Sequence, residues 1–370
     1  MAKGKKAKQQ GKAVLLVVEI FIVVILIGLL IWVCKDPFFG VEHKEEGGKG
    51  PLISVDFDES NLSVTVPTED ENEHMLGYRN IALFGVDTRD SDPKSLVKGT
   101  LSDSIIIASI NEDTGEIKLV SVYRDTYLNL ASTSDPDKYG KCNSAYSYGG
   151  AEQAIRMLNE NLGLDITEFV TVGFSGLTQA VDALGGIYLD VDKEELKHIN
   201  SYQQTMAEDL NMKWTPVEET GYQLLNGLQV TAYCRIRYRK GNDFARAEAQ
   251  REVIQALVDK AKTEDISKLT KAVEKVSENV YTSFQIEDIL ALLPNLTKYK
   301  IVDENGFPHE SMRGAGTLGS KSYVYAIDLD DNVKWLHEFL FNDVDYVPSE
   351  TVASYSEAVH NFVSQYVDID

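Results

Sequence analysis

Short apolar runs bounded by polar residues fill the middle of the chain and predict a series of strands. Three successive runs, YRNIALFGVD, SDSIIIASI and EIKLVSVYRD, have the length and the β-branched content of buried strands. The segment NEDTG between the second and third runs has the length of a hairpin turn. We therefore expect three adjacent strands that run up, down and up.

An alternation of helical and strand patterns follows these runs. The expected order is helix GGAEQAIRMLNENLG, strand EFVTVGF, helix SGLTQAVDALGG and strand IYLDV. Such an order is typical of layered α/β folds. Residues 193–220 form a polar excursion with the length of a lid or an insertion.

Later elements are predicted in the same way. LQVTAYCRIR has the pattern of a strand, and DFARAEAQREVIQALVDKAK that of a helix with Asp243 as its N-cap. Amphipathic helices near 265–280 and 285–293, a strand SYVYAID and a helix DNVKWLHEFLF complete the expected fold. The last twenty residues are polar, and no regular structure is predicted for them.

Near the N-terminus, residues 13–34 read AVLLVVEIFIVVILIGLLIWVC, an apolar run interrupted only by Glu19. About 20 apolar residues of helix span a bilayer, so this run predicts a transmembrane helix. Five lysines precede it, which predicts a cytoplasmic N-terminus and a membrane-anchored chain that lies otherwise outside the cell. Because no small-residue cleavage site follows the run, we expect the anchor to be retained.

These patterns predict five parts of the chain. They are a cytoplasmic basic tail at 1–12, the transmembrane helix at 13–34, a stalk at 35–77, a folded domain at 78–345 and a C-terminal tail at 346–370.

The net charge of the chain limits the kinds of partner that it is expected to bind. The net charge is −22, and the part after residue 34 carries 31 basic and 57 acidic residues, a net of −26. A surface of that sign repels nucleic acid, so a nucleic-acid partner is not expected and any anion site must be local. The two cysteines outside the span, Cys142 and Cys234, lie between polar residues, so one disulfide is open, but we expect two unpaired buried thiols.

Despite the acidic background, cations concentrate in the segment YCRIRYRKGNDFARAEAQREVI. On a strand Arg235, Arg237 and Arg239 would share one face, and Arg246 would lie in the first turns of the following helix. Helix N-termini attract anions, and arginine forks match phosphate oxygens. The segment therefore predicts a phosphate site, although a solvated, salt-bridged strand face would have the same spacing.

The three predicted strands place further charges at one edge of their sheet. Asp87 ends the first run, Asp103 begins the second and Arg124 ends the third, so these side chains should converge. The two carboxylates could hold Mg²⁺, although turn-forming or capping roles would also explain them. Arginines with a carboxylate-held Mg²⁺ are what a phosphoryl-transfer site on a diphosphate requires.

Six motifs, taken in order, resemble the LytR-CpsA-Psr (LCP) family between about Tyr78 and Phe341: NIALFGVDTRD, SDSIIIASI, VSVYRDT, KCNSAYSYGG, GYQLLNGLQVTAYCRIRYR and DFARAEAQREVI. The resemblance implies a membrane-anchored, Mg²⁺-dependent phosphotransferase at the outer face of the cell membrane. Such enzymes move an anionic glycopolymer, of teichoic acid or capsular polysaccharide type, from a polyprenyl-diphosphate carrier to peptidoglycan. The implied fold is a single α-β-α layered domain with a central mixed sheet and a hydrophobic tunnel for the prenyl chain.

By position, the resemblance also implies roles for individual residues. Asp87 and Asp103 would bind the metal. The implied catalytic residues are Asp103, Arg124, Arg235 and Arg237. The residues expected to contact the diphosphate are Arg89, Lys141, Asp243, Arg246 and Gln250.

Two departures from the family pattern bear on this prediction. Tyr123 stands where the family usually has proline, and Ala249 where it has a second arginine. They leave open a changed donor or reduced activity, and a loss of activity would make the chain a glycan- or lipid-binding protein without catalysis. A separate alternative keeps the site but uses water as acceptor, which would make the chain a polyprenyl-diphosphate pyrophosphatase.

Overall fold

The computed structural model describes residues 62, 75–88, 93–97, 99–210, 212–237, 243–277, 279–285, 289–290 and 293–369. The predicted basic tail, the predicted transmembrane helix, nearly all of the predicted stalk and Arg89 lie outside these residues. Within the described part of the chain, no helix combines the length and the apolar character needed to cross a membrane.

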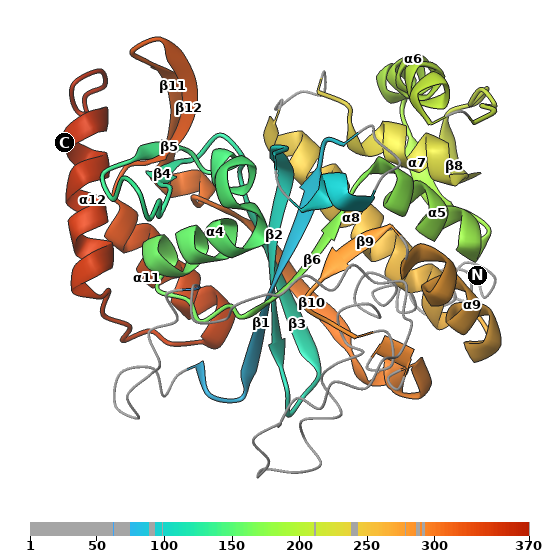
Figure 1. The fold of residues 1–370 in the computed structure, drawn as a ribbon, viewed down its shortest axis with the longest axis horizontal. Helices are drawn as coiled ribbons and strands as arrows, with labels where there is room; N and C mark the ends of the chain where they lie inside the picture. The colour runs from blue at the N-terminus through green and yellow to red at the C-terminus, as the bar shows by residue number, and fades with distance from the viewer. Residues whose placement is uncertain are drawn as a thin grey trace, which may run out of the picture. The chain divides into compact units, whose positions relative to one another are not determined.

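Three antiparallel strands form the centre of the sheet, as the apolar runs predict. They are β1 (Tyr78–Val86), β2 (Ser102–Asn111) and β3 (Glu116–Val122). β1 pairs with β2 and β2 pairs with β3, so the up, down, up arrangement is confirmed (Figure 1). Their apolar side chains are almost all buried, because both faces of the sheet are covered.

The chain divides into two compact units, and the central strands belong to the second. Among the described residues, the first unit comprises Pro93 and those within Val172–Ile301, and the second comprises Leu62, residues 75–88 and those within Lys94–Thr171 and Val302–Asp370. The predicted α/β fold with a central mixed sheet is confirmed.

In the second unit, two more strands flank the central three. They are β6 (Glu168–Val172) and β10 (Lys300–Phe307), which give the order β10-β3-β2-β1-β6. Arg79 of β1 forms a bidentate ion pair with Glu168 of β6, which holds strands β1 and β6 side by side.

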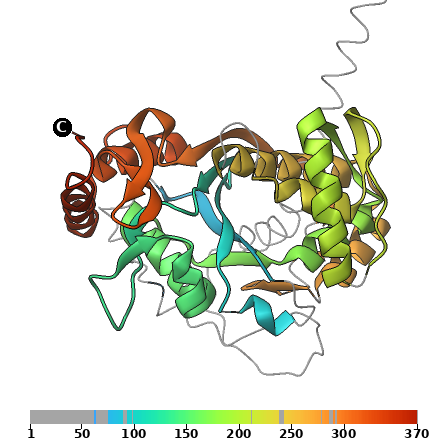
Figure 2. The same cartoon turned by 90° about the horizontal axis from the view of Figure 1, so that it is seen from above.

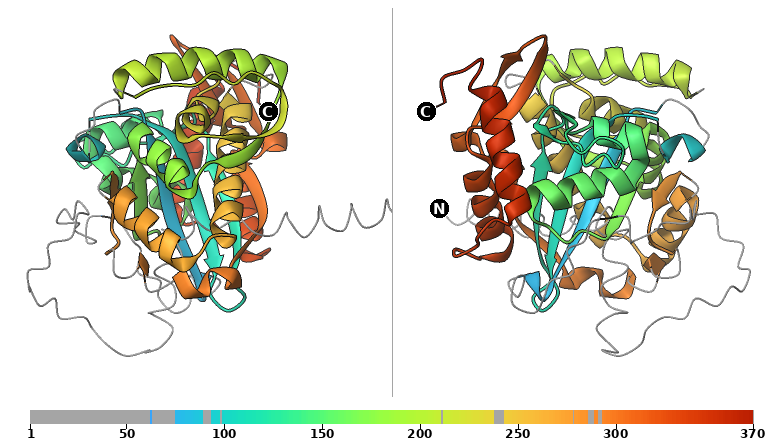
Figure 3. Two further views of the ribbon diagram at one scale, coloured as in Figure 1. Left: turned by 90° about the vertical axis from the view of Figure 1, so that its right-hand side faces the viewer. Right: turned by 60° about the vertical axis from the view of Figure 1, so that its left-hand side comes forward.

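Helices and short ribbons complete the second unit. Helix α4 lies against β2, and α12 packs on α11, α4 and the β4–β5 ribbon (Figures 1 and 3). The bounds are β4 (Tyr127–Asn129), β5 (Tyr139–Lys141), α4 (Ser144–Leu162), β11 (Arg313–Leu318), β12 (Lys321–Ala326), α11 (Leu329–Phe341) and α12 (Glu350–Val363), with 3-10 turns η3 (Pro93–Leu96) and η5 (Glu310–Met312).

The first unit is built mainly from helices. In Figure 2 the yellow-green helices α5, α6 and α7 lie together with the β7–β8 ribbon. The bounds are α5 (Phe174–Leu184), β7 (Ile187–Val191), α6 (Lys193–Asp209), β8 (Gly221–Leu225), α7 (Gly227–Cys234), α8 (Asp243–Lys262), α9 (Ile266–Ser277), β9 (Val280–Thr282) and η4 (Leu293–Lys298).

Two predictions of local structure were wrong, and the polar excursion at 193–220 has more regular structure than its pattern indicates. LQVTAYC is helix α7 and not a strand, because Asn226 and Gln229 form a capping box that starts a helix. Most of the polar excursion is helix α6, which Asp192 caps together with Glu195. The C-terminal residues do not lack structure, because α12 buries Val352, Val359 and Val363. The helix predicted at 285–293 falls mostly outside the described residues.

Candidate functional site

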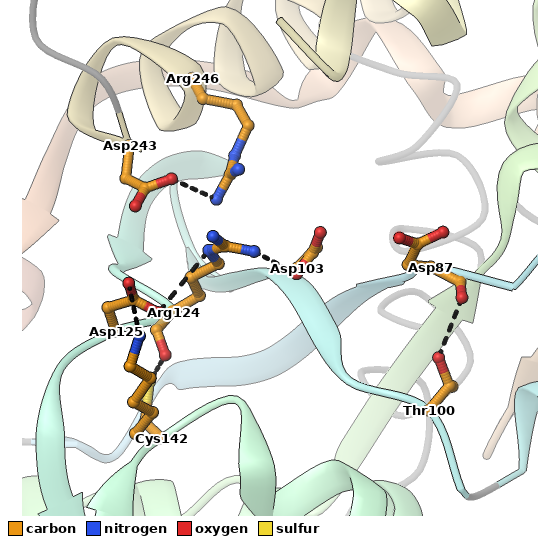
Figure 4. A network of polar contacts seen from close by, with 9 residues as sticks. Asp87, Thr100, Asp103, Arg124, Asp125, Cys142, Asp243 and Arg246 are labelled. Carbon is orange, nitrogen blue, oxygen red and sulfur yellow. Dashed lines mark hydrogen bonds and ion pairs between the residues drawn. The ribbon is translucent and has the colours of Figure 1, made fainter. Parts of the chain in front are cut away.

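Three predicted site residues of the second unit lie at one edge of its sheet, where the neighbouring strands β1, β2 and β3 begin or end. Asp87 follows the end of β1, Asp103 lies near the start of β2, and Arg124 follows the end of β3. The Nη1 atom of Arg124 donates a hydrogen bond of 2.7 Å to Oδ1 of Asp103 (Figure 4). The expected convergence of Asp103 and Arg124 is therefore observed, since antiparallel neighbours bring these chain ends together.

A β-bulge sets the position of Asp103. Gly85 is opposite Ser104 and Val86 is opposite Ser102, so Asp103 is the extra residue of β2. A bulge interrupts the ladder and turns a side chain away from its regular direction. Here it aims the Asp103 carboxylate at Arg124 (Figure 4).

A chain of alternating charges continues from Arg124. Oδ1 of Asp125 lies 3.7 Å from Nε of Arg124, and Oδ2 of Asp125 lies 3.0 Å from Nζ of Lys141. The side chains of Arg124 and Asp103 are only 16% and 22% exposed, so these interactions are less screened than surface ion pairs. Asp125 had no predicted role, although it directly follows Arg124 in the motif that carried the resemblance.

The backbone of the Arg124 turn, residues 123–126, is fixed by the segment before α4. The Cys142 N–H donates to the carbonyl oxygen of Thr126 (2.8 Å), and the Asn143 N–H donates to that of Arg124 (3.2 Å). The Cys142 thiol donates to the carbonyl oxygen of Tyr123 at 3.2 Å. Burial, and secondarily the charge of Asp125, raise the pKa of Cys142, so this thiol stays protonated as a donor.

Neither cysteine of the described region forms a disulfide bond, as we expected from the sequence. Cys142 belongs to the second unit and Cys234 to the first. Cys142 acts as a buried hydrogen-bond donor to the turn and not as a nucleophile, because only a thiolate is strongly nucleophilic.

Asp87 provides the second carboxylate at this edge. Its backbone N–H donates to Leu101 (3.4 Å) and its backbone carbonyl accepts from the Thr100 hydroxyl (3.2 Å). Its buried side-chain atom Oδ1 has no hydrogen-bond partner among the described residues. The Asp87 and Asp103 carboxylates point to the same side of their strands (Figure 4). A buried carboxylate oxygen without a donor is costly unless a cation or another donor meets it.

These two carboxylates could hold a divalent cation. Among the described residues, no group of three or more His, Cys, Asp and Glu side chains gathers as a metal site. A cation held here would therefore need further ligands from water or a substrate, which is usual for Mg²⁺.

Another set of predicted site residues belongs to the first unit. Arg235 is the C-cap residue of α7, and its guanidinium lies 4.3 Å from the ring centre of Phe174 and 5.7 Å from that of Tyr202. Arg237 is exposed and lies beyond the helix. The prediction that both arginines share the face of a strand was wrong, because the strand is helix α7.

Helix α8 begins with an ion pair. Nη2 of Arg246 lies 2.8 Å from Oδ1 of Asp243, and the Arg246 side chain is only 4% exposed. Asp243 is the first described residue of the helix, so its predicted role as N-cap stays a prediction. Gln250 is half-buried one turn after Arg246, and Ala249 is buried. Arg246 is therefore held in one direction by a neighbour on its own helix.

The predicted site residues thus fall into two groups, one in each unit. The second unit brings together Asp87, Asp103, Arg124 and Lys141, and the first contains Arg235, Arg237, Asp243, Arg246 and Gln250. Their catalytic and binding roles stay predictions. The sequence did not point to Asp125, Phe174 or Tyr202, because their contacts join segments far apart in the chain.

A protein-family model, LytR_cpsA_psr family, matches residues 54–338, more than half of the chain. Biofilm regulatory protein A of Streptococcus mutans is 33% identical over 226 residues, which cover 60% of this chain and 53% of that protein. The polyisoprenyl-teichoic acid–peptidoglycan teichoic acid transferase TagV of Bacillus subtilis is 28% identical over 263 residues, which cover 68% of this chain and 62% of that protein. The matches thus span less than two thirds of either curated relative.

Solved structures share the fold. The crystal structure of B. subtilis TagV is 26% identical, with a TM-score of 0.55 over 73% of this chain and 98% of that one. A TagT structure with bound octaprenyl pyrophosphate lipid is 20% identical, with a TM-score of 0.53 over 73% and 92% of the two chains. At that identity the likeness shows the fold alone.

Proposed function

The chain belongs to the LytR-CpsA-Psr family, and from this premise we propose that it transfers a glycopolymer from a polyprenyl-diphosphate carrier to peptidoglycan. The name of its relative TagV, a teichoic acid transferase, supports a glycopolymer of the teichoic acid type. The acceptor hydroxyl attacks the phosphorus on the sugar side of the diphosphate. A new phosphodiester bond forms, the bridging P–O bond breaks, and polyprenyl phosphate leaves.

The observation that carries this proposal is the pre-ordered arginine at the sheet edge. Asp103 and Asp125 hold the Arg124 guanidinium before any substrate binds, and the buried turn fixes its backbone. A guanidinium fixed in this way can bind phosphate oxygens and stabilise the negative charge that grows in the transition state. Because the donor is already oriented, little reorganisation is needed during the reaction.

Asp87 and Asp103 are the residues that we propose for Mg²⁺. The buried Oδ1 of Asp87, which has no hydrogen-bond partner, and the oxygen-only character of the pair support this assignment. When bound, Mg²⁺ supplies positive charge that offsets the charge of the diphosphate. Asp103 also orients Arg124, so this carboxylate has two tasks.

Lys141 extends the positive charge beyond Arg124. Its pair with Asp125 at 3.0 Å keeps its ammonium group near the turn, where it can attract an anionic donor. The proposal that Arg235, Arg237, Asp243, Arg246 and Gln250 bind the same diphosphate rests on the resemblance. Arg89 is assigned on the same basis.

We further propose that residues 13–34 anchor the chain in the cell membrane, with the N-terminus inside and residues from 35 onward outside. The apolar run and the five preceding lysines support this topology. It would place the enzyme where a lipid-linked donor and peptidoglycan are both accessible.

A reconstituted transfer reaction tests the function. The purified full-length chain in mild detergent is incubated with a synthetic polyprenyl-diphosphate glycan, peptidoglycan oligomers and Mg²⁺, and both released prenyl phosphate and linked glycan are measured. Arg124→Ala is compared with Lys334→Ala, a variant on the exposed face of α11. We expect linked glycan from the parent and from Lys334→Ala, and almost none from Arg124→Ala.

The products separate the alternatives. Release of prenyl phosphate without linked glycan would indicate a pyrophosphatase. An intact donor that binds but is never cleaved would indicate a binding protein without catalytic activity, and would contradict the proposal.

A further inference from the structure

Tyr123, the residue before Arg124, is held by residues that come much later in the chain. Its ring is only 6% exposed, and its N–H donates to the carbonyl oxygen of Phe307 at 3.0 Å. Nη1 of Arg313 donates to the phenol oxygen of Tyr123 at 3.1 Å, and the Arg313 guanidinium carbon lies 4.8 Å from the centre of the ring. Arg313 therefore holds Tyr123 in place through both a hydrogen bond and a cation–π contact.

The strand beside Tyr123 is shaped to receive its ring. Gly306 of β10 lies so close that a Cβ there would overlap the phenol oxygen and ring of Tyr123. Any side chain at position 306 would push the tyrosine out of place. Nη1 of Arg313 also donates to the carbonyl oxygen of Pro308 at 3.2 Å, which ties the arginine to the same segment.

Strand β12, the second strand of the β11–β12 ribbon, holds the C-terminal end of the Arg124 turn. The N–H of Val324 donates to the carbonyl oxygen of Asp125 at 2.9 Å, and Thr126 forms a bridge with Val324. Residues 306–326 thus contact the turn at Tyr123 on one side of Arg124 and at Asp125 and Thr126 on the other. Arg124 therefore lies between two positions of the turn that are held by residues 306–326.

We propose that Arg313 is a positioning residue that directs the Arg124 guanidinium toward Asp103 through Tyr123. The importance of this direction for catalysis rests on the proposed function. The direction itself is a property of the fold.

The chemistry of Arg313 suits this task better than that of lysine. A planar guanidinium can stack on a ring while one of its nitrogens donates in the plane to two oxygens. A lysine ammonium could reach one of the oxygens, but it would lose the stacking. Tyrosine at 123 is equally specific, because proline would remove the N–H that donates to Phe307 and would offer no phenol to Arg313.

The test measures the coupling between Arg124 and Asp103 in the full-length chain. Thermal unfolding midpoints are compared for the parent, Asp103→Ala, Arg124→Ala and the double variant, first with Arg313 present and then with Arg313→Ala. Such a cycle isolates the pair from general changes in stability. The same cycle with Lys118→Ala is the control, because Lys118 on β3 donates to the carbonyl oxygen of Phe339 and does not contact the turn.

We expect a coupling of about 2 °C in the parent and in the Lys118→Ala background. With Arg313→Ala the coupling should fall below half of that value. An unchanged coupling would overturn the proposal, because Arg313 would then act only as a structural residue. If Arg313→Ala does not fold, Tyr123→Phe replaces it in the same cycle and decides in the same way, since it removes only the phenol acceptor.

Transfer assays then connect the position to the reaction. We expect Arg313→Ala to lower kcat about tenfold with KM changed less than twofold, and to have almost no further effect in the Arg124→Ala background. An equal loss in both backgrounds would contradict an action through Arg124. A parent that transfers nothing would refute the proposed function, whereas the coupling would still decide whether Arg313 positions Arg124.

Discussion

The Arg124 turn and the arginines that follow α7 hold their cations in different ways. Arg124 has carboxylate partners on both sides, and the backbone of its turn, residues 123–126, is hydrogen-bonded to Phe307, to Cys142 and Asn143, and to Val324. Arg235 rests on aromatic rings, and Arg237 is exposed beyond the helix end. One region presents a cation between two carboxylates, and the other presents one cation stacked on aromatic rings and one cation exposed at the surface.

This difference shows what a fixed charge requires. A guanidinium keeps one direction only when its backbone and its hydrogen-bond partners are both ordered, as at Arg124. Stacking on Phe174 and Tyr202 limits Arg235 less, because a cation–π contact tolerates sliding over the ring. We therefore expect substitutions at the turn to affect the rate most, and substitutions after α7 to affect it less.

The largest expected effect is that of Arg124→Ala. Loss of one pre-ordered donor to a developing negative charge typically lowers a rate by about 10²–10³-fold, and we expect this loss in kcat for transfer. Arg237→Ala should lower the rate by only about tenfold, because this exposed side chain must be ordered when the donor binds. Initial rates at saturating donor measure both variants. Equal losses would show that the two regions do not differ as described.

Asp87→Asn sharpens the role of the carboxylates at the edge. We expect transfer to fall at least about tenfold, since even outer partners of a bound metal are worth 10–100-fold. The unfolding midpoint without Mg²⁺ should not fall, because the neutral amide is less costly to bury than a carboxylate without a hydrogen-bond partner. Calorimetry with and without Mg²⁺ measures the midpoint, and activity against Mg²⁺ concentration measures the metal requirement. A lowered midpoint together with full activity would argue against a metal at Asp87.

Asp243→Ala tests the fixed arginine of the first unit. Arg246 would lose its partner at 2.8 Å while remaining almost fully buried, so we expect the free energy of unfolding to fall by about 1–3 kcal/mol. Lys334→Ala breaks an exposed ion pair with Asp331 and should change stability by less than about 0.5 kcal/mol. Urea denaturation of both variants makes the comparison. Similar small changes would mean that water satisfies Arg246.

The smallest effect is expected for Arg235→Lys. The charge is retained, but stacking on Phe174 and Tyr202 is weakened, which costs about 0.5–1 kcal/mol. We expect transfer to fall about threefold, mainly through KM for the donor. A fall of a hundredfold would place Arg235 with Arg124 among the cations whose direction is fixed.

The sheet edge could be predicted from sequence because its order is local. Each of the three strands is an uninterrupted apolar run, and short connections make them neighbours. Asp103 and Arg124 could be brought together from this pattern alone. The bulge that aims Asp103 could not, because it depends on the register between two strands.

Helix α7 was missed because two signals in it conflict. The alternation in LQVTAYCRIR matches a strand, whereas Asn226 and Gln229 begin a helix by capping each other's backbone. The capping box was decisive because it satisfies N–H groups that the first turn of a helix otherwise leaves without an acceptor. Helix α6 carries the same signal at Asp192 and Glu195, within a segment too polar to suggest a buried face.

The contacts of Arg313 could not be predicted from sequence at all. Nothing in the segment RGAGTL indicates a tyrosine partner, and the two residues are 190 positions apart. Only the fold shows that Gly306 and Arg313 both lie against the ring of Tyr123. Such long-range pairs leave no periodic pattern in a single sequence.

The same separation has a consequence for how the chain folds during synthesis. Arg124 and Asp103 leave the ribosome early, but the bonds from Arg313 and Val324 to the turn can form only after some 200 further residues have been made. Contacts between distant parts of a chain form late, because a long loop must close first. A nascent chain that stops before residue 313 could build the three-stranded centre of the sheet and would still lack the bonds that Arg313 and Val324 make to Tyr123 and Asp125. Truncated copies of the chain would therefore lack the complete site, because its last contacts form only when these residues have been made.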